Sequence, residues 1–163
     1  KGQRPAPSTY LSSGYIQQHL AKFEKEGGAF IVVKSWIEKG SYKEFPIRKF
    51  VMLNDDMETI IRKYRQSKDI SIIEKALGYK KGDLQGLEDD LYLFKVEGSN
   101  FKFEIPSGNE IGTNDLWIPG GKTSGGYREA VLINKNNSNI SIIHNKDIDF
   151  LKNQFKWEKV KKF

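Results

Sequence analysis

A glycine-rich segment holds most of the side chains that could contact a ligand. Between Pro106 and Glu129 the chain carries six glycines, with polar and charged residues between them. Glycines allow backbone conformations and close approaches that a side chain forbids. A loop of this length without secondary structure of its own is uncommon in a compact domain and is often functional. We therefore predict a substrate-binding loop whose contact residues are Asn109, Asn114, Trp117, Lys122, Thr123 and Arg128.

Two carboxylates of the same segment are candidates for catalysis. Glu110 lies within the loop, and Glu129 closes it at the start of an apolar run that ends at Ile133. A carboxylate at the first residue of a strand is held rigidly beside a loop that can contact substrate. The glycine pairs match neither the Walker nor the Rossmann pattern, so they predict no nucleotide-binding fingerprint. We predict Glu129 and Glu110 as catalytic residues.

The chain has two histidines, His19 and His144, and imidazole is the side chain whose ordinary pKa lies nearest neutrality. A ribonuclease that uses no metal needs a base for the 2′-hydroxyl, an acid for the leaving 5′-oxygen and a cation for the phosphate. Either glutamate could be the base, and either histidine could be the acid. The cation could come from Lys34, Lys122 or Arg128. The sequence permits this arrangement without showing that the groups meet in space.

The composition excludes several other kinds of site. The chain has no cysteine, which excludes a disulfide framework, a thiolate metal centre and a cysteine nucleophile. Two histidines are too few for a histidine-rich metal centre. Asp55 is expected to cap a helix, and the acidic residues 88–90 are expected in a solvated loop. We therefore expect neither a metal site nor a bound cofactor.

Hydrophobic periodicity predicts the elements that position these residues. Helices are expected at about 14–26, capped by Ser12 or Ser13, and from 54 onward, with a buried stripe from Met57 to Tyr64. Strands are expected at 29–34, 50–53, 91–97, 101–105, 129–133 and 140–144, with a hairpin turn at 98–100. A short helix after residue 147 precedes a basic, solvated tail. This order predicts a single α+β domain with N-terminal helices and a C-terminal antiparallel sheet.

Length and charge fit one basic domain. The chain has 163 residues, which is the size of a single domain. Its 27 Lys and Arg against 21 Asp and Glu give a net charge of +6. Such a charge favours a polyanionic partner, either nucleic acid or an acidic protein. No apolar run is long enough to predict a membrane-spanning helix.

Two stretches resemble the C-terminal toxin domains of bacterial polymorphic toxins, the variable tips of contact-dependent inhibition, Rhs and LXG-type proteins. The first contains Arg4-Pro5-Ala6-Pro7-Ser8-Thr9-Tyr10-Leu11, then Tyr15-Ile16 and His19-Leu20-Ala21-Lys22-Phe23. The second is the segment from Pro106 to Glu129, continued by Ala130-Val131. The resemblance implies that residues 1–13 are a linker from an upstream delivery protein and that residues 14–163 are the toxin effector domain. It also implies secretion or cell-surface delivery, action in the cytoplasm of a target cell, and a cognate immunity protein.

Toxin domains of this group carry several chemistries, so three functions stay open. The first is a metal-independent ribonuclease acting on tRNA or rRNA, which the basic charge favours and which makes RNA an expected partner. The second is an NAD glycohydrolase or ADP-ribosyltransferase, with NAD as substrate. There, Trp117-Ile-Pro-Gly-Gly followed by Glu129 is similar to how such enzymes place their last catalytic acid, although no Arg or Ser-Thr-Ser partner accompanies it. The third is a non-enzymatic module that uses the glycine-rich loop to hold a protein.

Overall fold

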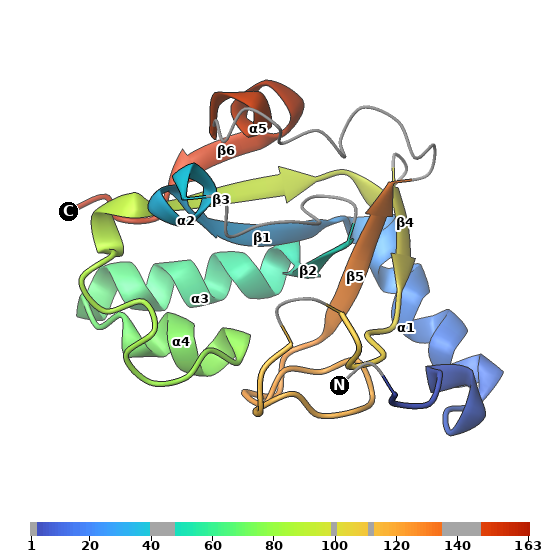
Figure 1. Ribbon diagram of the computed structural model, residues 1–163. Coiled ribbons are helices and arrows are strands. Elements are labelled where there is room, and N and C mark those ends of the chain that lie inside the picture. The colour runs from blue at the N-terminus through green and yellow to red at the C-terminus, as the bar shows by residue number, and fades with distance from the viewer. Residues whose placement is uncertain (1–2, 40–47, 99–100, 111–112, 135–147) are drawn as a thin grey trace.

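The protein has an α+β fold built on one six-stranded antiparallel sheet, as the sequence predicted (Figure 1). A computed structural model describes residues 3–39, 48–98, 101–110, 113–134 and 148–163. The strand order is β4-β5-β2-β1-β3-β6, and every pairing of neighbours is antiparallel. The central strands β1 and β2 come from the first half of the chain, so the sheet draws on both halves.

The first half begins with a 3₁₀ turn, η1 (Pro7–Thr9), and the helix α1 (Ser13–Glu26). The Ser12 hydroxyl caps α1 by accepting a hydrogen bond from the Tyr15 amide at 3.1 Å. Strand β1 (Gly28–Val33) follows and is buried along its whole length, and the short helix α2 (Lys34–Glu38) continues from it. The predicted helix and strand are therefore confirmed to within one residue at each end.

The central strand β2 is followed by two helices that pack beside each other. Strand β2 (Arg48–Leu53) leads directly into α3 (Asn54–Ser67), and α4 (Ser71–Leu77) packs beside α3. The predicted stripe from Met57 to Tyr64 is buried. The predicted cap is wrong: the residue before α3 is Leu53, which offers no side-chain cap, and Asp55 lies inside the first turn. There its charge still faces the positive end of the helix dipole.

The second half supplies η2 (Glu88–Asp90), β3 (Leu91–Val96), β4 (Phe101–Glu104), β5 (Glu129–Asn134), α5 (Ile148–Gln154) and β6 (Lys156–Lys159). The predicted hairpin at 98–100 is wrong, because β3 pairs with β1 and β6 whereas β4 pairs with β5. The predicted strand at 140–144 lies outside the described residues. Strand β6 was missed, because Lys156-Trp-Glu-Lys159 has the polarity of a solvated tail.

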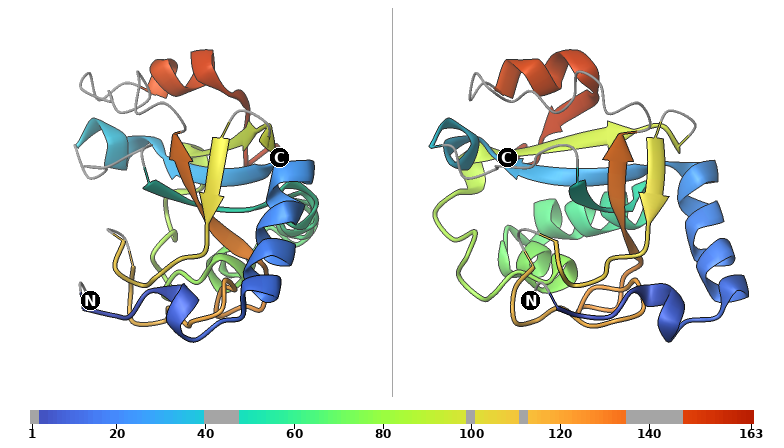
Figure 2. Two further views of the ribbon diagram at one scale, coloured as in Figure 1. Left: turned by 90° about the vertical axis from the view of Figure 1, so that its right-hand side faces the viewer. Right: turned by 45° about the vertical axis from the view of Figure 1, so that its right-hand side comes forward.

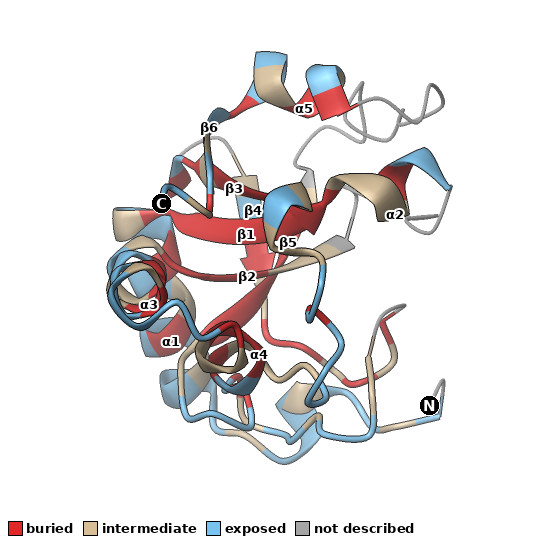
Figure 3. Ribbon diagram, turned by 90° about the vertical axis from the view of Figure 1, so that its left-hand side faces the viewer, coloured by how far each residue is buried: buried red, intermediate tan, exposed pale blue. Residues whose placement is uncertain are grey.

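Two hydrophobic cores lie on the two faces of the sheet (Figure 3). The first core contains Phe23 of α1 and Leu151 of α5, packed against one face. The second contains Met57 of α3 and Ile73 of α4, packed against the other. Alternation along each strand sends successive side chains to opposite cores. None of the described helices is both long and apolar enough to cross a membrane.

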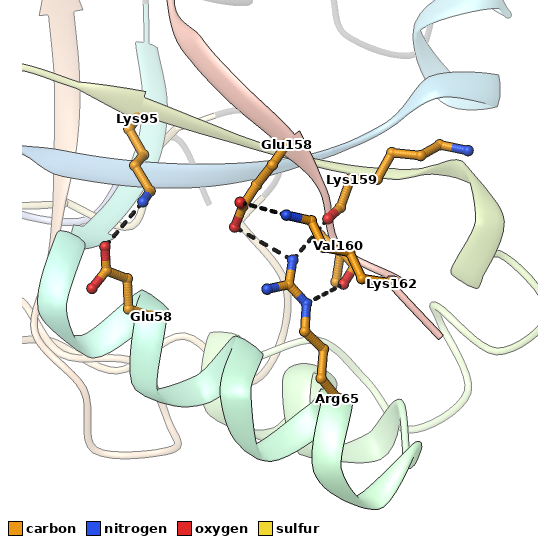
Figure 4. A network of polar contacts seen from close by, with 7 residues as sticks. All are labelled: Glu58, Arg65, Lys95, Glu158, Lys159, Val160 and Lys162. Carbon is orange, nitrogen blue, oxygen red and sulfur yellow. Dashed lines mark hydrogen bonds and ion pairs between the residues drawn. The ribbon is translucent and has the colours of Figure 1, made fainter.

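Arg65 fastens the C-terminal strand to α3 (Figure 4). Its Nε donates to the Val160 carbonyl at 2.8 Å, and one terminal nitrogen donates to the Lys159 carbonyl at 2.8 Å. The same nitrogen lies 3.3 Å from a carboxylate oxygen of Glu158. The guanidinium group thus satisfies the carbonyl of the last residue of β6 and that of the residue after it.

Candidate active site

The glycine-rich loop between β4 and β5 lies beside η1, α1 and α4, at the end of the molecule where the chain begins (Figure 2). It ends in a narrow hairpin in which Lys122 and Arg128 form an antiparallel bridge. The Glu129 amide donates to the Gly121 carbonyl at 2.8 Å, and Glu129 then pairs with Met52 of β2. The main chain of Glu129 is therefore held by two neighbours, Gly121 of the hairpin and Met52 of β2.

The side chain of Glu129 is buried on the face of the second core. Cross-strand partners point to the same face, and Met52 belongs to that core. Glu129 is only 7% exposed. Among the described residues no hydrogen bond or ion pair reaches its carboxyl group. Burial, and secondarily the charge of Glu110, raise the pKa of Glu129 to about 7. The group is therefore close to half-protonated at neutral pH.

Glu110 supplies the second carboxylate. It is 8% exposed, and its oxygens accept hydrogen bonds from the Ser107 amide at 3.0 Å, the Ser107 hydroxyl at 2.9 Å and the Gly108 amide at 3.0 Å. Burial and the charge of Glu110 also raise the pKa of Tyr10, which follows η1. The charge of Glu110 therefore acts on both Glu129 and Tyr10. The two carboxyl groups differ in hydrogen bonding, because Glu110 has three donors and Glu129 has none among the described residues.

His19 forms a hydrogen bond with the main chain of Glu129 and not with its carboxyl group. The imidazole Nε2 donates to the Glu129 carbonyl at 2.8 Å, and the ring lies between Tyr15 and Phe23 with centroid distances of 6.0 and 5.6 Å. Burial lowers the pKa of His19, against the hydrogen bond to Glu129 that raises it, and the charge of Arg128 lowers it further. His19 is therefore a neutral, buried imidazole whose hydrogen bond connects α1 to the start of β5.

Lys122 and Arg128 bring two positive charges together. They are bridge partners in the hairpin, and both charges lower the pKa of His19. Within the described part of the chain neither side chain has an ion-pair partner. Neither charge contributes to the pKa of Glu129, in keeping with strand alternation, which turns Arg128 to the opposite face. Two like charges held side by side without an anion are suited to bind a phosphate group.

Two of the predicted contact residues bind the segment before α1. The Arg4 guanidinium carbon lies 4.8 Å from the Trp117 ring centroid, and Arg4 donates to the Gly108 carbonyl at 2.6 Å. Asn109 accepts from the Arg4 amide at 3.0 Å and donates to the Arg4 carbonyl at 2.9 Å. Gly108 has a φ of +87°, and a Cβ there would lie 2.8 Å from Trp117. Trp117 and Asn109 thus hold residues near Arg4 against the loop.

Asn114 and Thr123 attach the loop to α4. The Asn114 amide donates to the Gly78 carbonyl at 2.8 Å, and the Thr123 hydroxyl donates to the Ala76 carbonyl at 2.6 Å. Thr123 is buried, and its hydroxyl also accepts from the Tyr127 amide at 3.3 Å. The polar atoms that the sequence suggested for a substrate are thus engaged in holding the loop in place.

Two predicted residues remain. His144 is outside the described residues, and Lys34 forms an exposed ion pair with Glu38 at 3.7 Å. Sequence reasoning missed Lys49 of β2, where burial lowers the pKa to about 8. In the sequence Lys49 is a lysine directly before an apolar strand, and this pattern is too common to identify a functional residue. A hollow of about 610 Å³ near Asn54 and Lys156 contains none of the predicted site residues.

In the described parts of the chain, no group of three or more His, Cys, Asp or Glu side chains is placed to hold a metal ion. No protein-family model, curated protein or solved structure matches this chain.

Proposed function

We propose that this domain is an RNA-cleaving toxin effector that acts on tRNA or rRNA without a metal ion, with Glu129 as the group that transfers the proton. The observation that carries the proposal is the buried carboxyl of Glu129, whose pKa of about 7 lies at the operating pH. General acid–base catalysis is most effective when the pKa of the catalytic group is near the ambient pH.

The raised pKa of Glu129 also bears on the choice between ribonuclease chemistry and NAD cleavage. An NAD-consuming enzyme uses its carboxylate as a fixed negative charge against an oxocarbenium-like transition state, and that role needs a fully ionised group. A carboxyl group with a pKa near 7 gives up half of that charge at neutral pH. A general base that removes a proton from a ribose hydroxyl, by contrast, is most effective when its pKa lies near the operating pH. The raised pKa therefore favours ribonuclease chemistry over the NAD alternative.

In the proposed reaction the ionised Glu129 removes the proton from a 2′-hydroxyl. The 2′-oxygen then attacks the adjacent phosphorus, the bond to the 5′-oxygen breaks, and that oxygen takes up a proton from solvent. The products are a 2′,3′-cyclic phosphate and a 5′-hydroxyl. Lys122 and Arg128 lie on the other face of the hairpin, so we assign them to a phosphate next to the scissile one.

The test uses the purified domain with total tRNA, rRNA and NAD in separate reactions, each with and without excess EDTA. We expect RNA cleavage that survives EDTA, ends in cyclic phosphates and rises with pH through about 7. Glu129→Gln should reduce the rate by roughly 10²–10⁴-fold. Glu104→Gln, which removes a half-buried carboxylate from neighbouring β4, is the matched control and should cleave normally. NAD depletion without RNA cleavage would establish the alternative, and activity on neither substrate would favour a binding module.

We also propose that the domain is delivered from the cell surface or by secretion into the cytoplasm of a target cell, where a cognate immunity protein neutralises it. The resemblance of the stretches around Arg4–Phe23 and Pro106–Glu129 to polymorphic-toxin tips supports this. Cytoplasmic expression of the domain should arrest growth, and co-expression of the adjacent gene product should restore it. Unimpaired growth with folded domain present would exclude a toxin.

A further inference from the structure

A second basic surface, with exposed aromatic character, lies far from the glycine-rich loop. It consists of Lys152 of α5 and of Trp157 and Lys159 of β6, which lie over the buried ring of Tyr92 of β3, and we call it the β6 surface. All views place α5 and β6 at one end of the molecule and the loop at the other (Figures 1 and 2). Trp157 is 44% exposed although its ring lies 5.8 Å from that of Tyr92.

Lysines surround these two rings. The Lys152 ammonium lies 4.2 Å from the Trp157 ring centroid and 4.9 Å from that of Tyr92. The Lys159 ammonium lies 5.7 Å from the Tyr92 centroid. Cations at such distances from aromatic faces are held by the ring quadrupole. Lys159 is exposed and can reach an anion, whereas the Lys152 side chain is 23% exposed. The β6 surface therefore combines a stacking platform with positive charge.

Strand alternation separates this surface from the nearby acid. Trp157 pairs with Phe94 and Lys159 pairs with Tyr92, so both point to the side of the first core and α5. Glu158, between them, points to the opposite face, where it meets Arg65. On the α5 side Lys152 lies 3.9 Å from Asp149, and within the described residues Lys159 has no ion pair. The positive charge on this face is therefore only partly neutralised.

Protection of a sheet edge does not account for this arrangement. Lysines on an edge strand discourage pairing with other chains, but an exposed tryptophan on the same strand works against that purpose. Base stacking on an aromatic side chain, with lysines following the backbone, is how proteins bind single strands without reading sequence. A double helix keeps its bases stacked inside and cannot use such a platform.

We propose that the β6 surface binds unpaired RNA, as a second contact that holds single-stranded or loop regions of the substrate. This deepens the proposed function and rests on it for the identity of the polyanion. It commits the substrate class to RNA with unpaired bases, of which tRNA and rRNA loops are examples. The acidic immunity protein is the alternative occupant that the test must distinguish.

The test measures binding rather than cleavage. The Glu129→Gln domain is titrated with oligothymidylate DNA of about 20 nucleotides. This is longer than the roughly 4–16 nucleotides that one OB fold binds, and it lacks the 2′-hydroxyl needed for the reaction. Trp157→Ala should weaken binding about tenfold, and Trp157→Phe, which keeps a stacking ring, should restore most of it. Replacing both Lys152 and Lys159 by Gln should reduce the slope of log K against log salt by about 1.4. Replacing both Arg62 and Lys63 by Gln, on the exposed side of α3, removes the same number of charges and should behave like the parent.

Heparin, a polyanion without bases, separates stacking from charge. Trp157→Ala should leave heparin affinity unchanged while oligothymidylate affinity falls, and a duplex of equal length should bind more weakly than the single strand. Equal affinity of Trp157→Ala and parent for oligothymidylate would overturn the proposal. So would loss of binding to purified immunity protein, rather than to oligothymidylate, on substitution of Trp157. Because cleavage plays no part in this assay, failure here leaves the RNA-cleavage test standing, and the reverse also holds.

Discussion

Replacing Glu129 by glutamine should stabilise the fold at alkaline pH while removing activity. The folded protein raises the pKa of Glu129 from 4.5 to about 7, so the folded state holds a proton that the unfolded state has lost. Stability from this group is therefore complete below pH 4.5 and is lost as pH rises through about 7. At 1.36 kcal/mol for each pKa unit, ionising the buried carboxyl costs the folded state about 3 kcal/mol. Glutamine carries no charge at any pH and avoids that cost.

The assay is urea unfolding of both proteins at pH 5 and pH 8, with the difference between variant and wild type compared at the two values. Between these pH values the advantage of Glu129→Gln should grow by about 2–3 kcal/mol, because most of the ionisation occurs there. Near pH 8 the midpoint of thermal unfolding should rise by about 5–10 °C. Titration of His19 is common to both proteins and cancels in the comparison.

A difference between the two proteins that does not change with pH would refute the reasoning, because it would mean that Glu129 ionises as freely in the fold as in the unfolded chain. Loss of stability at both pH values would show instead that the carboxyl makes a contact which the amide cannot replace. An equal pH-dependent gain in the Glu104→Gln control would show that the effect is not specific to Glu129. A variant that is more stable and inactive would place Glu129 among residues whose function is maintained at the expense of stability.

Three further substitutions test how the site is held. His19→Phe keeps the stacking with Tyr15 and Phe23 but leaves the Glu129 carbonyl without its donor, so it should cost about 1–3 kcal/mol in urea unfolding. The lowered pKa of His19 means that wild type loses stability as pH falls below about 6.5, and the His19→Phe protein should lack that component. Gly121→Ala requires a side chain at a φ of +75° with its Cβ 2.7 Å from the His19 Nε2, so the melting temperature should fall by several degrees. Arg65→Met should speed amide exchange in β6 without altering the proposed RNA cleavage at the distant loop. Unchanged exchange would contradict the role given to its two carbonyl contacts.

The fold class, the helix at 13–26 and the stripe from Met57 to Tyr64 could be predicted because each rests on local periodicity. The pairing of β3 with β1 and β6 could not, because Gly98 gives a turn signal whether or not the flanking strands pair with each other. Strand β6 escaped prediction because tertiary context, through Arg65 and β3, makes a strand of a lysine-rich tail.

In the candidate site, too, some features could be predicted from the sequence and others could not. Glu129 stood out through its position at the end of the loop and the start of a strand, and the structure holds it there by main-chain pairing. Its burial and the resulting pKa depend on Glu110 and on the second core, which the sequence does not place in space. His19 was singled out by residue type alone. That its partner is a carbonyl and not a carboxylate depends on how α1 crosses the sheet.

Three side chains outside the glycine-rich loop bind its backbone, in addition to the contacts that the loop's own side chains make. Arg4, Tyr15 and His19 each donate to a main-chain carbonyl, those of Gly108, Gly120 and Glu129. A main-chain carbonyl is the same in every residue, so these three hydrogen bonds do not depend on which side chains the loop carries. Exposed positions such as Leu116 and Ile118 are therefore open to replacement at little cost in stability. A lineage under pressure to change its target, or to escape an inhibitor, could vary these positions freely, and a library randomised there should yield mostly folded proteins with altered recognition.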